Sequence, residues 1–290
     1  MNSVTIMYII QGLHGLAYGM LLFLVASGLT LVFGMMGILN LAHASFFMLS
    51  AYFCYSVLVV SGNFWLALLL APLIAAFFGI LVERFLLRRV HAQGHIGELL
   101  LTLGVMLVIL EGVKAFWGTE SLIISVPPSL SGLVSIGSIR YPLYRLFIIL
   151  LSIFVLGFMV LILFKTRLGK IVQAAVSNAN MVSALGINTP VVFMLVFGIG
   201  TWLAGIAGVA AAPLLTVFPG MADQMGMDAF VVVVVGGLGS LGGAFLASLM
   251  IGELNAFGVQ FIPRLAPVLM FTFMAVVLAI KPTGFFGERE

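Results

Sequence analysis

Charged residues are scarce in this 290-residue sequence. Only 7% of the residues are charged, 63% are hydrophobic, and the mean hydropathy is +1.31. A soluble domain usually carries about 25% charged and about 45–50% apolar residues. A soluble protein of this composition could not cover its surface with polar groups, whereas lipid covers the apolar belt of an integral membrane protein. The composition therefore predicts a membrane protein.

Several chemical signatures are also missing. The single cysteine, Cys54, cannot form an intrachain disulfide, and no CxxC or Cys/His spacing suggests a metal site. No G-x-x-x-x-G-K-[ST] motif is present, so we expect no ATP bound through a P-loop. An enzyme is not favoured, because the sequence has no Ser/His/Asp constellation and no suitably paired carboxylates. The net charge of +3 is explained by membrane topology and gives no reason to expect nucleic acid.

Long apolar runs dominate what is present. A spanning helix needs roughly 20 apolar residues, and backbone groups in lipid must be bonded within their own segment or in a closed barrel. Runs without strict alternation exclude the barrel. We therefore predict an all-α polytopic transmembrane helix bundle in a single domain, residues 1–290, with about 8–10 membrane segments, some of them broken or re-entrant. The candidate spans are 9–34, 46–60, 64–82, 97–117, 142–164, 191–211, 227–236, 244–259 and 266–280.

Two candidate spans, 46–60 and 227–236, are short enough to be half-helices or re-entrant segments. Basic residues gather in loops 83–98 and 165–190, and Lys281 and Arg289 lie in the C-terminal tail. Because Lys and Arg favour cytoplasmic loops, these parts and the C-terminus are predicted to be cytoplasmic. Nine spans would then place the N-terminus outside, and an even number of spans would place it inside. Asp223 and Asp228 are predicted to lie in an outer loop.

Residues 231–243, VVVVVGGLGSLGG, contain the G-x-G-x-x-G pattern of a dinucleotide-binding turn. Such a turn needs an acidic residue about 20 positions later, after a second strand. Phe257 stands near that position, in a membrane segment. We therefore interpret the valines as a short membrane segment and the glycines as a turn or helix break at its cytoplasmic end.

Three stretches carry a resemblance to a known family. They are GLAYGMLLFLVASGLTLVFGMMGILNLAHASFFMLSAY, TRLGKIVQAAVSNANMVSALGIN and VVVVVGGLGSLGGAFLASLMIG. They resemble the permease subunits of branched-chain amino acid ABC importers, some of which carry urea or short amides. The resemblance implies a subunit in the bacterial or archaeal inner membrane that binds no cofactor itself. Its implied partners are membrane lipid, a related second permease in a heterodimer, two cytoplasmic ATPases that use the ATP, and an extracytoplasmic binding protein.

The loop 165–190 is too polar to span and is predicted to form short helices with one apolar face. The resemblance implies that it contains a coupling helix, which would lie in a groove of an ATPase. The alternative is a linker helix on the membrane surface. The candidate coupling residues are Gln173, Ala174, Ala175, Asn178, Ala184, Leu185 and Gly186.

The segment GMMGILNLAHASF, residues 34–46, interrupts two apolar runs. Broken helices at membrane depth often build substrate sites because helix ends present free backbone groups. An amino acid zwitterion needs partners for its carboxylate and its ammonium group, and Asn40, His43 and Ser45 could supply some of them. The alternative is a short polar connection in which these residues cap or pack. Thr102, Gly236, Gly237 and Gly239 are further candidates for the pathway.

Three charged residues lie in apolar segments. Glu111 and Lys114, three residues apart, would share a helix face as an ion pair. Glu253 stands alone, and an intramembrane acid indicates either function, such as proton coupling, or a hydrogen bond to a neighbouring backbone. Together with two glycine-broken segments, Glu253 leaves a stand-alone secondary transporter or channel as the alternative function.

Overall fold

The structure is a computed structural model that describes residues 3–37, 39–91, 94–137 and 139–287. Eight helices in this part of the chain are long and apolar enough to cross a membrane, which confirms the predicted all-α polytopic bundle. The helices are α1 Ser3–Met36, α2 His43–Ser61, α3 Phe64–Val82, α4 Arg88–Val90, α5 His95–Trp117, α6 Leu143–Lys165, α7 Arg167–Ala184, α8 Thr189–Ala211, α9 Met221–Gly236, α10 Leu241–Phe261 and α11 Ala266–Ile280. A π-helical turn, Glu83–Leu87, joins α3 to α4, and 3₁₀ turns occupy Pro128–Leu130 and Pro263–Leu265.

The two short candidate spans have different outcomes. The suggestion that 46–60 is a half-helix is wrong, because α2 begins at His43 and reaches 19 residues, a spanning length. Its first residues are polar and were excluded by an apolar-run criterion. The segment 227–236 lies in α9, which has 16 residues and is not among the eight spanning helices. The prediction of an outer loop at Asp223 and Asp228 is also wrong, since both residues lie in α9.

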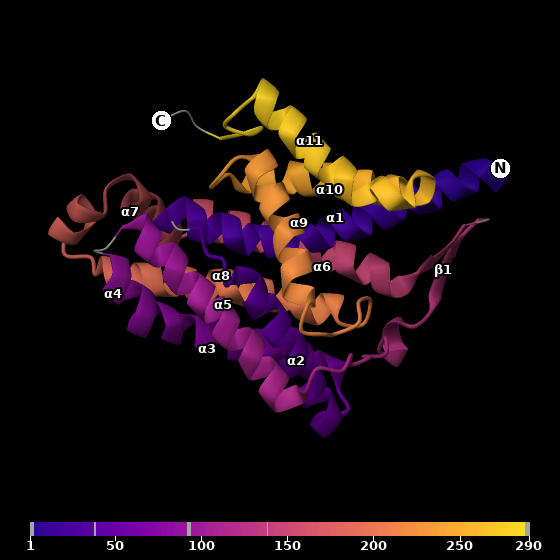
Figure 1. Ribbon diagram of the computed structural model, residues 1–290, viewed down its shortest axis with the longest axis horizontal. Coiled ribbons are helices and arrows are strands. Elements are labelled where there is room, and N and C mark those ends of the chain that lie inside the picture. Colours follow the sequence, from indigo (N-terminus) through magenta and orange to yellow (C-terminus); the bar gives the residue numbers. More distant parts are fainter. Residues whose placement is uncertain (1–2, 38, 92–93, 138, 288–290) are drawn as a thin grey trace.

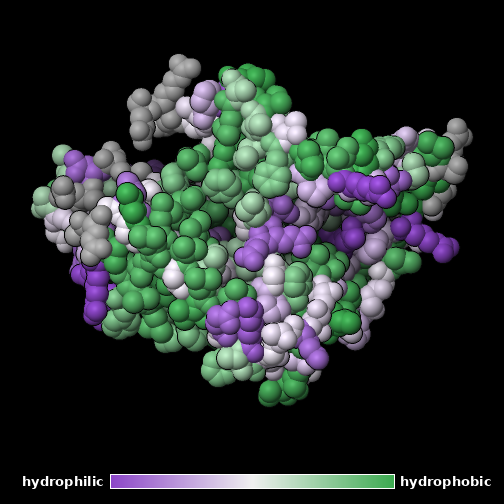
Figure 2. All heavy atoms as spheres, in the orientation of Figure 1, coloured by the Kyte–Doolittle hydropathy of each residue, from purple (hydrophilic) through white to green (hydrophobic). Residues whose placement is uncertain are grey.

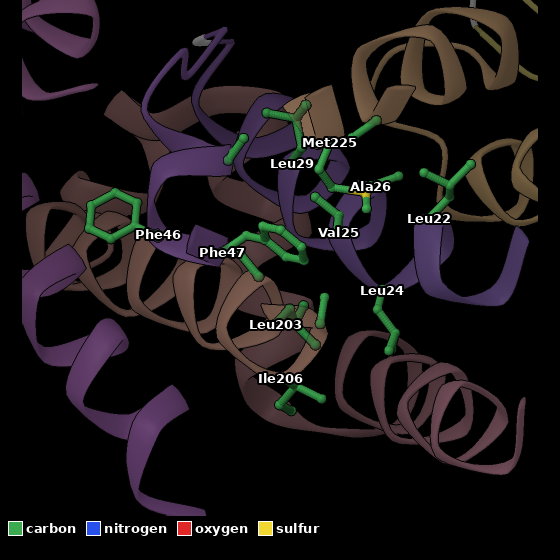
Figure 3. Packing of buried hydrophobic residues seen from close by; sticks show 14 of the residues in the cluster. Leu22, Leu24, Val25, Ala26, Leu29, Phe46, Phe47, Leu203, Ile206 and Met225 are labelled. Carbon is green, nitrogen blue, oxygen red and sulfur yellow. The ribbon is translucent and has the colours of Figure 1, made fainter. Parts of the chain in front are cut away.

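Helix α1 forms the centre of the bundle and packs mainly against α10 and α8 (Figure 1). Its most apolar window is 83% buried. The predicted small-residue packing is confirmed where α1 crosses α10, because a Cβ atom added to Gly19 would lie 2.6 Å from the carbonyl oxygen of Ser248. Figure 3 shows the adjoining core, where Phe47 of α2 lies between Val25 of α1 and Leu203 of α8.

The remaining surface fits a lipid environment. Hydrophobic side chains cover most of the face over α3 and α5 in Figure 2, and Leu100, Val108 and Leu69 are among the exposed ones. Such an apolar face would be a liability in water, whereas in a bilayer it contacts acyl chains. The fold therefore agrees with the composition.

The two ends of the bundle differ in character (Figure 1). The N-terminus lies at the same end as an antiparallel hairpin, β1 Leu133–Ile136 and β2 Ile139–Pro142, in which Val134 pairs with Tyr141. The Tyr141 hydroxyl donates to the Leu13 carbonyl at 2.6 Å and attaches this hairpin to α1. We call this the hairpin end. Helices α4 and α7 lie at the opposite end, here called the basic end, with Arg88, Arg89 and Lys170.

Candidate functional site

The break between α1 and α2 brings polar groups to the middle of the bundle. Gly37 has φ 66°, a left-handed conformation that ends α1 at little cost because glycine has no Cβ. The chain then turns back, and the backbone N–H of Ala42 donates to Asn40 Oδ1 at 3.1 Å. His43 Nε2 lies 3.1 Å from the carbonyl oxygen of Val25, about two-thirds of the way along α1. Helix α2 therefore begins inside the bundle, beside the final third of α1.

Helix α9 approaches the same region from the second half of the chain. A Cβ atom added to Gly226 would lie 2.9 Å from Ala44 Cβ, so α9 lies directly against the start of α2. On its other side, the Tyr18 hydroxyl of α1 donates to Asp228 Oδ2 at 2.6 Å. A carboxylate inside an apolar bundle needs such a partner, which explains why Asp228 is tolerated there.

A cavity of about 470 Å³ opens between these elements. This volume lies in the roughly 300–1,000 Å³ range of small-molecule sites. Its wall comes from α1, residues 39–41, the first turn of α2, α5 and α9, and it is mostly apolar. The polar side chains in the wall are Asn40, His43, Ser45 and Asp223.

Three of these polar side chains are buried and incompletely bonded. Asn40, His43 and Ser45 are only 1–3% exposed. Asn40 Nδ2, His43 Nδ1 and Ser45 Oγ have no hydrogen-bond partner in the described part of the chain. Buried polar atoms are nearly always bonded, so these three atoms are exceptions gathered around the start of α2. The structure thus brings together the three residues that the sequence analysis placed in a substrate pathway, while Asn40 Oδ1 also caps as the alternative expected.

Helix α7 occupies the predicted coupling region at the basic end (Figure 1). Thr166 caps its start by accepting from Gly169 N–H at 3.2 Å, and Asn178 has a non-helical conformation that bends it. The candidate coupling residues are exposed except for Ala175, which is buried within the protein. Met181 and Leu185 are 62% and 75% exposed, so an apolar surface remains available for a partner.

Comparisons with known proteins agree with this geometry. Residues 12–279 match the family described as branched-chain amino acid transport system / permease component. The chain belongs to this family. It is 28% identical to the high-affinity branched-chain amino acid transport system permease protein BraD of Pseudomonas aeruginosa, over 98% of this chain and 97% of that protein.

More distant relatives include an archaeal one. The permease is 27% identical to the high-affinity branched-chain amino acid transport system permease protein LivH of Salmonella typhimurium, over 100% of this chain and 99% of that protein. The probable branched-chain amino acid transport permease protein LivH of Methanocaldococcus jannaschii is 24% identical over 93% of this chain and 90% of its own length. No solved structure gives a significant match. Membership in a family of transport permeases confirms a transport subunit rather than an enzyme, and does not favour a stand-alone carrier.

The other predicted pathway residues of the permease lie outside the cavity wall. Thr102 is buried in α5, where its hydroxyl donates to the Leu99 carbonyl at 3.1 Å, one turn from the cavity residue Met106. Gly236, Gly237 and Gly239 lie at the far end of α9, where the predicted turn is confirmed.

The C-terminal tail of the permease closes that end of α9. The backbone N–H groups of Phe285 and Phe286 donate to the carbonyls of Val235 and Gly236 at 2.9 and 3.0 Å. A Cβ atom added to Gly239 would lie 3.0 Å from Gly34 Cα, so the end of α1 joins this contact. Of the tail residues used to predict topology, Arg289 lies outside the described residues.

The intramembrane charges have separate outcomes. Lys114 Nζ and Glu111 Oε1 are 2.7 Å apart, which confirms the predicted local ion pair. Glu253 lies against α1, where its carboxylate would contact a Cβ atom added to Gly15 at 2.6 Å. The hydrogen bonds of the described residues do not include Glu253, so the expected bond to a neighbouring backbone is not found.

Sequence analysis missed a polar cluster at the basic end. His91 Nδ1 and Glu98 Oε1 are 2.5 Å apart, and His95 Nδ1 lies 3.5 Å from the second Glu98 oxygen. Nearby Glu83 is 1% exposed, and neither of its carboxylate oxygens has a partner among the described residues. The signal available in the sequence was the His95–Glu98 spacing of three, which places both on one helix face.

Proposed function

We propose that this permease is a subunit of an ATP-driven importer in a bacterial or archaeal inner membrane, where it translocates branched-chain or other hydrophobic amino acids. The observation that carries the proposal is the nearly full-length similarity to proteins named for branched-chain amino acid transport. The mostly apolar cavity supports it, because it offers aliphatic side chains a matching surface and a few polar groups for orientation.

The complete importer in this proposal contains four further components. They are a related second permease in a heterodimer, two cytoplasmic P-loop ATPases that use the ATP, and an extracytoplasmic binding protein. The basic residues beside α4 and α7 support a cytoplasmic basic end and C-terminus. The binding protein would then deliver substrate at the hairpin end.

Helix α7 is proposed as the coupling helix that docks on an ATPase. Its exposed Met181 and Leu185 suit an apolar groove. The Ser183 and Thr189 hydroxyls are 2.9 Å apart, and Gln173 Nε2 donates to the Leu163 carbonyl at 3.0 Å. Movement of α7 would therefore reach α8 and α6 directly. Since α8 packs against α1 and α2, this movement would change the cavity wall, and ATP would favour one of two bundle states.

The test is purification of the tagged permease from its native host in mild detergent. Recovery of a P-loop ATPase and a second permease, followed by ATP-dependent uptake of leucine in proteoliposomes containing the binding protein, is the expected result. Uptake of leucine by the purified permease alone, driven by an ion gradient, would overturn the proposal. Uptake of urea or a short amide instead of leucine by the complete complex would replace the substrate.

A further inference from the structure

Helix α9 carries two acidic side chains that lie on different sides of the helix. Asp223 lies in the cavity wall together with Gly226 and Phe230. Successive residues of an α-helix are turned by about 100°, so Asp228 is about 140° around the axis from Asp223 and about 160° from both Gly226 and Phe230. Asp228 is accordingly outside the cavity wall, and it lies on the side of α9 that meets α1.

The Tyr18 hydroxyl of α1 holds Asp228 on that side. It donates to Asp228 Oδ2 at 2.6 Å, within the range of about 2.5–2.7 Å for a hydroxyl bonded to a carboxylate. The ion pairs of the described residues do not include Asp228, so no basic side chain there shares the task. An unpaired carboxylate in an apolar bundle is costly. Rotation of α9 about its axis would break the bond and incur this cost.

The other contacts of α9 beside the cavity are small and apolar. Gly226 lies against Ala44 at the start of α2, and Gly220, the N-cap residue of α9, has no side chain that could cap the helix. A cavity of about 470 Å³ adjoins the same part of α9. Small residues beside a cavity leave a helix free to turn, whereas a hydrogen bond is directional. The Tyr18–Asp228 bond therefore selects one rotation.

We propose that Tyr18 and Asp228 are positioning residues for transport. Their hydrogen bond sets the rotation of α9 and thereby turns Asp223, Gly226 and Phe230 toward the cavity. Both residues act through α9, because neither lies in the cavity wall. The inference rests on the proposed function in one respect, namely that the cavity belongs to the transport pathway.

Three variants separate positioning from stability. Tyr18→Phe removes the donor and keeps the ring. Asp228→Asn keeps an acceptor oxygen and is the conservative variant that should preserve the bond. Tyr144→Phe is the matched control, because the Tyr144 hydroxyl also joins two helices, donating from α6 to the Ala210 carbonyl of α8 at 2.9 Å, but does not involve α9.

The first measurement is the reaction of a thiol introduced by Met227→Cys, in the α9 part of the cavity wall, with a water-soluble maleimide. Cys54 is fully buried and stays unreacted in the folded protein, so a second labelled thiol per chain would reveal unfolding. Adding Tyr18→Phe should change the rate constant by about fivefold or more, because the lost bond shifts the population of rotated helices. Adding Asp228→Asn or Tyr144→Phe should leave it unchanged.

The second measurement is uptake of radiolabelled leucine by the complete importer in proteoliposomes, with saturating leucine-loaded binding protein and Met227 intact. The initial rate per assembled complex should fall by about fivefold in Tyr18→Phe. Asp228→Asn and Tyr144→Phe should match the wild type.

Equal thiol reaction rates with and without Tyr18→Phe would overturn the inference. Equal changes in Tyr18→Phe and Tyr144→Phe would also overturn it, because the loss of any bond between helices would then have the same effect. If Tyr18→Phe does not fold, the double variant Tyr18→Phe/Asp228→Leu, which leaves no unpaired carboxylate, decides, and an unchanged thiol reaction rate overturns the inference. The thiol reaction needs no substrate, so a wild-type importer that takes up no leucine would refute the proposed function, while the thiol result would still decide this inference.

Discussion

Replacement of Gly252 by alanine is expected to destabilise the permease, because α10 crosses α1 at this position without space for a methyl group. A Cβ atom there would lie 2.5 Å from the carbonyl oxygen of Gly15 and 2.5 Å from both N and Cα of Gly19. These are backbone atoms of a helix held between α8 and α10, so they cannot rotate away as a side chain would. Helix α1 or α10 must shift instead.

The magnitude follows from a comparison with Gly112, a glycine in α5 with no neighbouring atom within 4 Å of its added Cβ. Both replacements gain the same helix propensity, up to about 1 kcal/mol, which cancels in the difference. The overpacking cost remains, and three backbone contacts place it near the upper end of the usual range, about 3 kcal/mol. At roughly 2–4 °C per kcal/mol, Gly252→Ala should unfold about 6–12 °C below Gly112→Ala.

Cys54 provides the assay, because it is the only cysteine of the chain and is fully buried in α2. A dye that becomes fluorescent on reaction with a thiol reports unfolding as the purified permease is heated in detergent. Wild type, Gly252→Ala and Gly112→Ala are compared at the same concentration. Equal transition temperatures for the two variants would refute the argument that the α1–α10 crossing excludes a Cβ atom.

Three further predictions concern the ends of the bundle. Leu185→Ala should weaken the association with an ATPase by about 1–2 kcal/mol in a titration of the detergent-purified components, whereas Val60→Ala, 89% exposed on α2, should not. Truncation after Pro282 removes two backbone hydrogen bonds to α9 and should lower stability by about 1–3 kcal/mol in the thiol assay; an unchanged transition would show that the tail contributes nothing. His91→Phe leaves Glu98, which is 4% exposed, without its closest partner. The free energy of unfolding should fall by about 1–3 kcal/mol, and a transition temperature equal to that of the wild type would contradict this.

The spanning helices could be predicted because the apolar length that crosses a bilayer is a local property of the sequence. Prediction failed where polar residues begin a helix inside the protein. His43 and Ser45 lie in the first turn of α2, and Asp223 lies in the first turn of α9, so an apolar window started too late in both cases. What makes these residues tolerable at that depth, such as the Tyr18–Asp228 hydrogen bond, joins positions about 210 residues apart.

The cavity could be predicted only in part for the same reason. The glycine-rich break identified Asn40, His43 and Ser45, since a helix interruption is visible in the sequence. Asp223 was assigned to a loop, and no sequence pattern indicated that α9 would lie against the start of α2. The Glu98–His91 pair was missed because a buried acid beside basic residues resembles an ordinary cytoplasmic loop until its burial is known.

The order in which the chain is made gives the C-terminal tail another significance. Phe285 and Phe286, whose amides bond the last carbonyls of α9, are about 50 residues beyond the helix that they complete. A ribosome that is inserting this chain into a membrane therefore finishes α10 and α11 while the end of α9 still lacks these two bonds. Helix α9 carries Asp223 at its other end, in the cavity wall. Helix α9 can thus gain these two bonds only after α10 and α11 have been synthesised, and a change at Phe285 or Phe286 would act on a helix whose other end lies in the cavity wall.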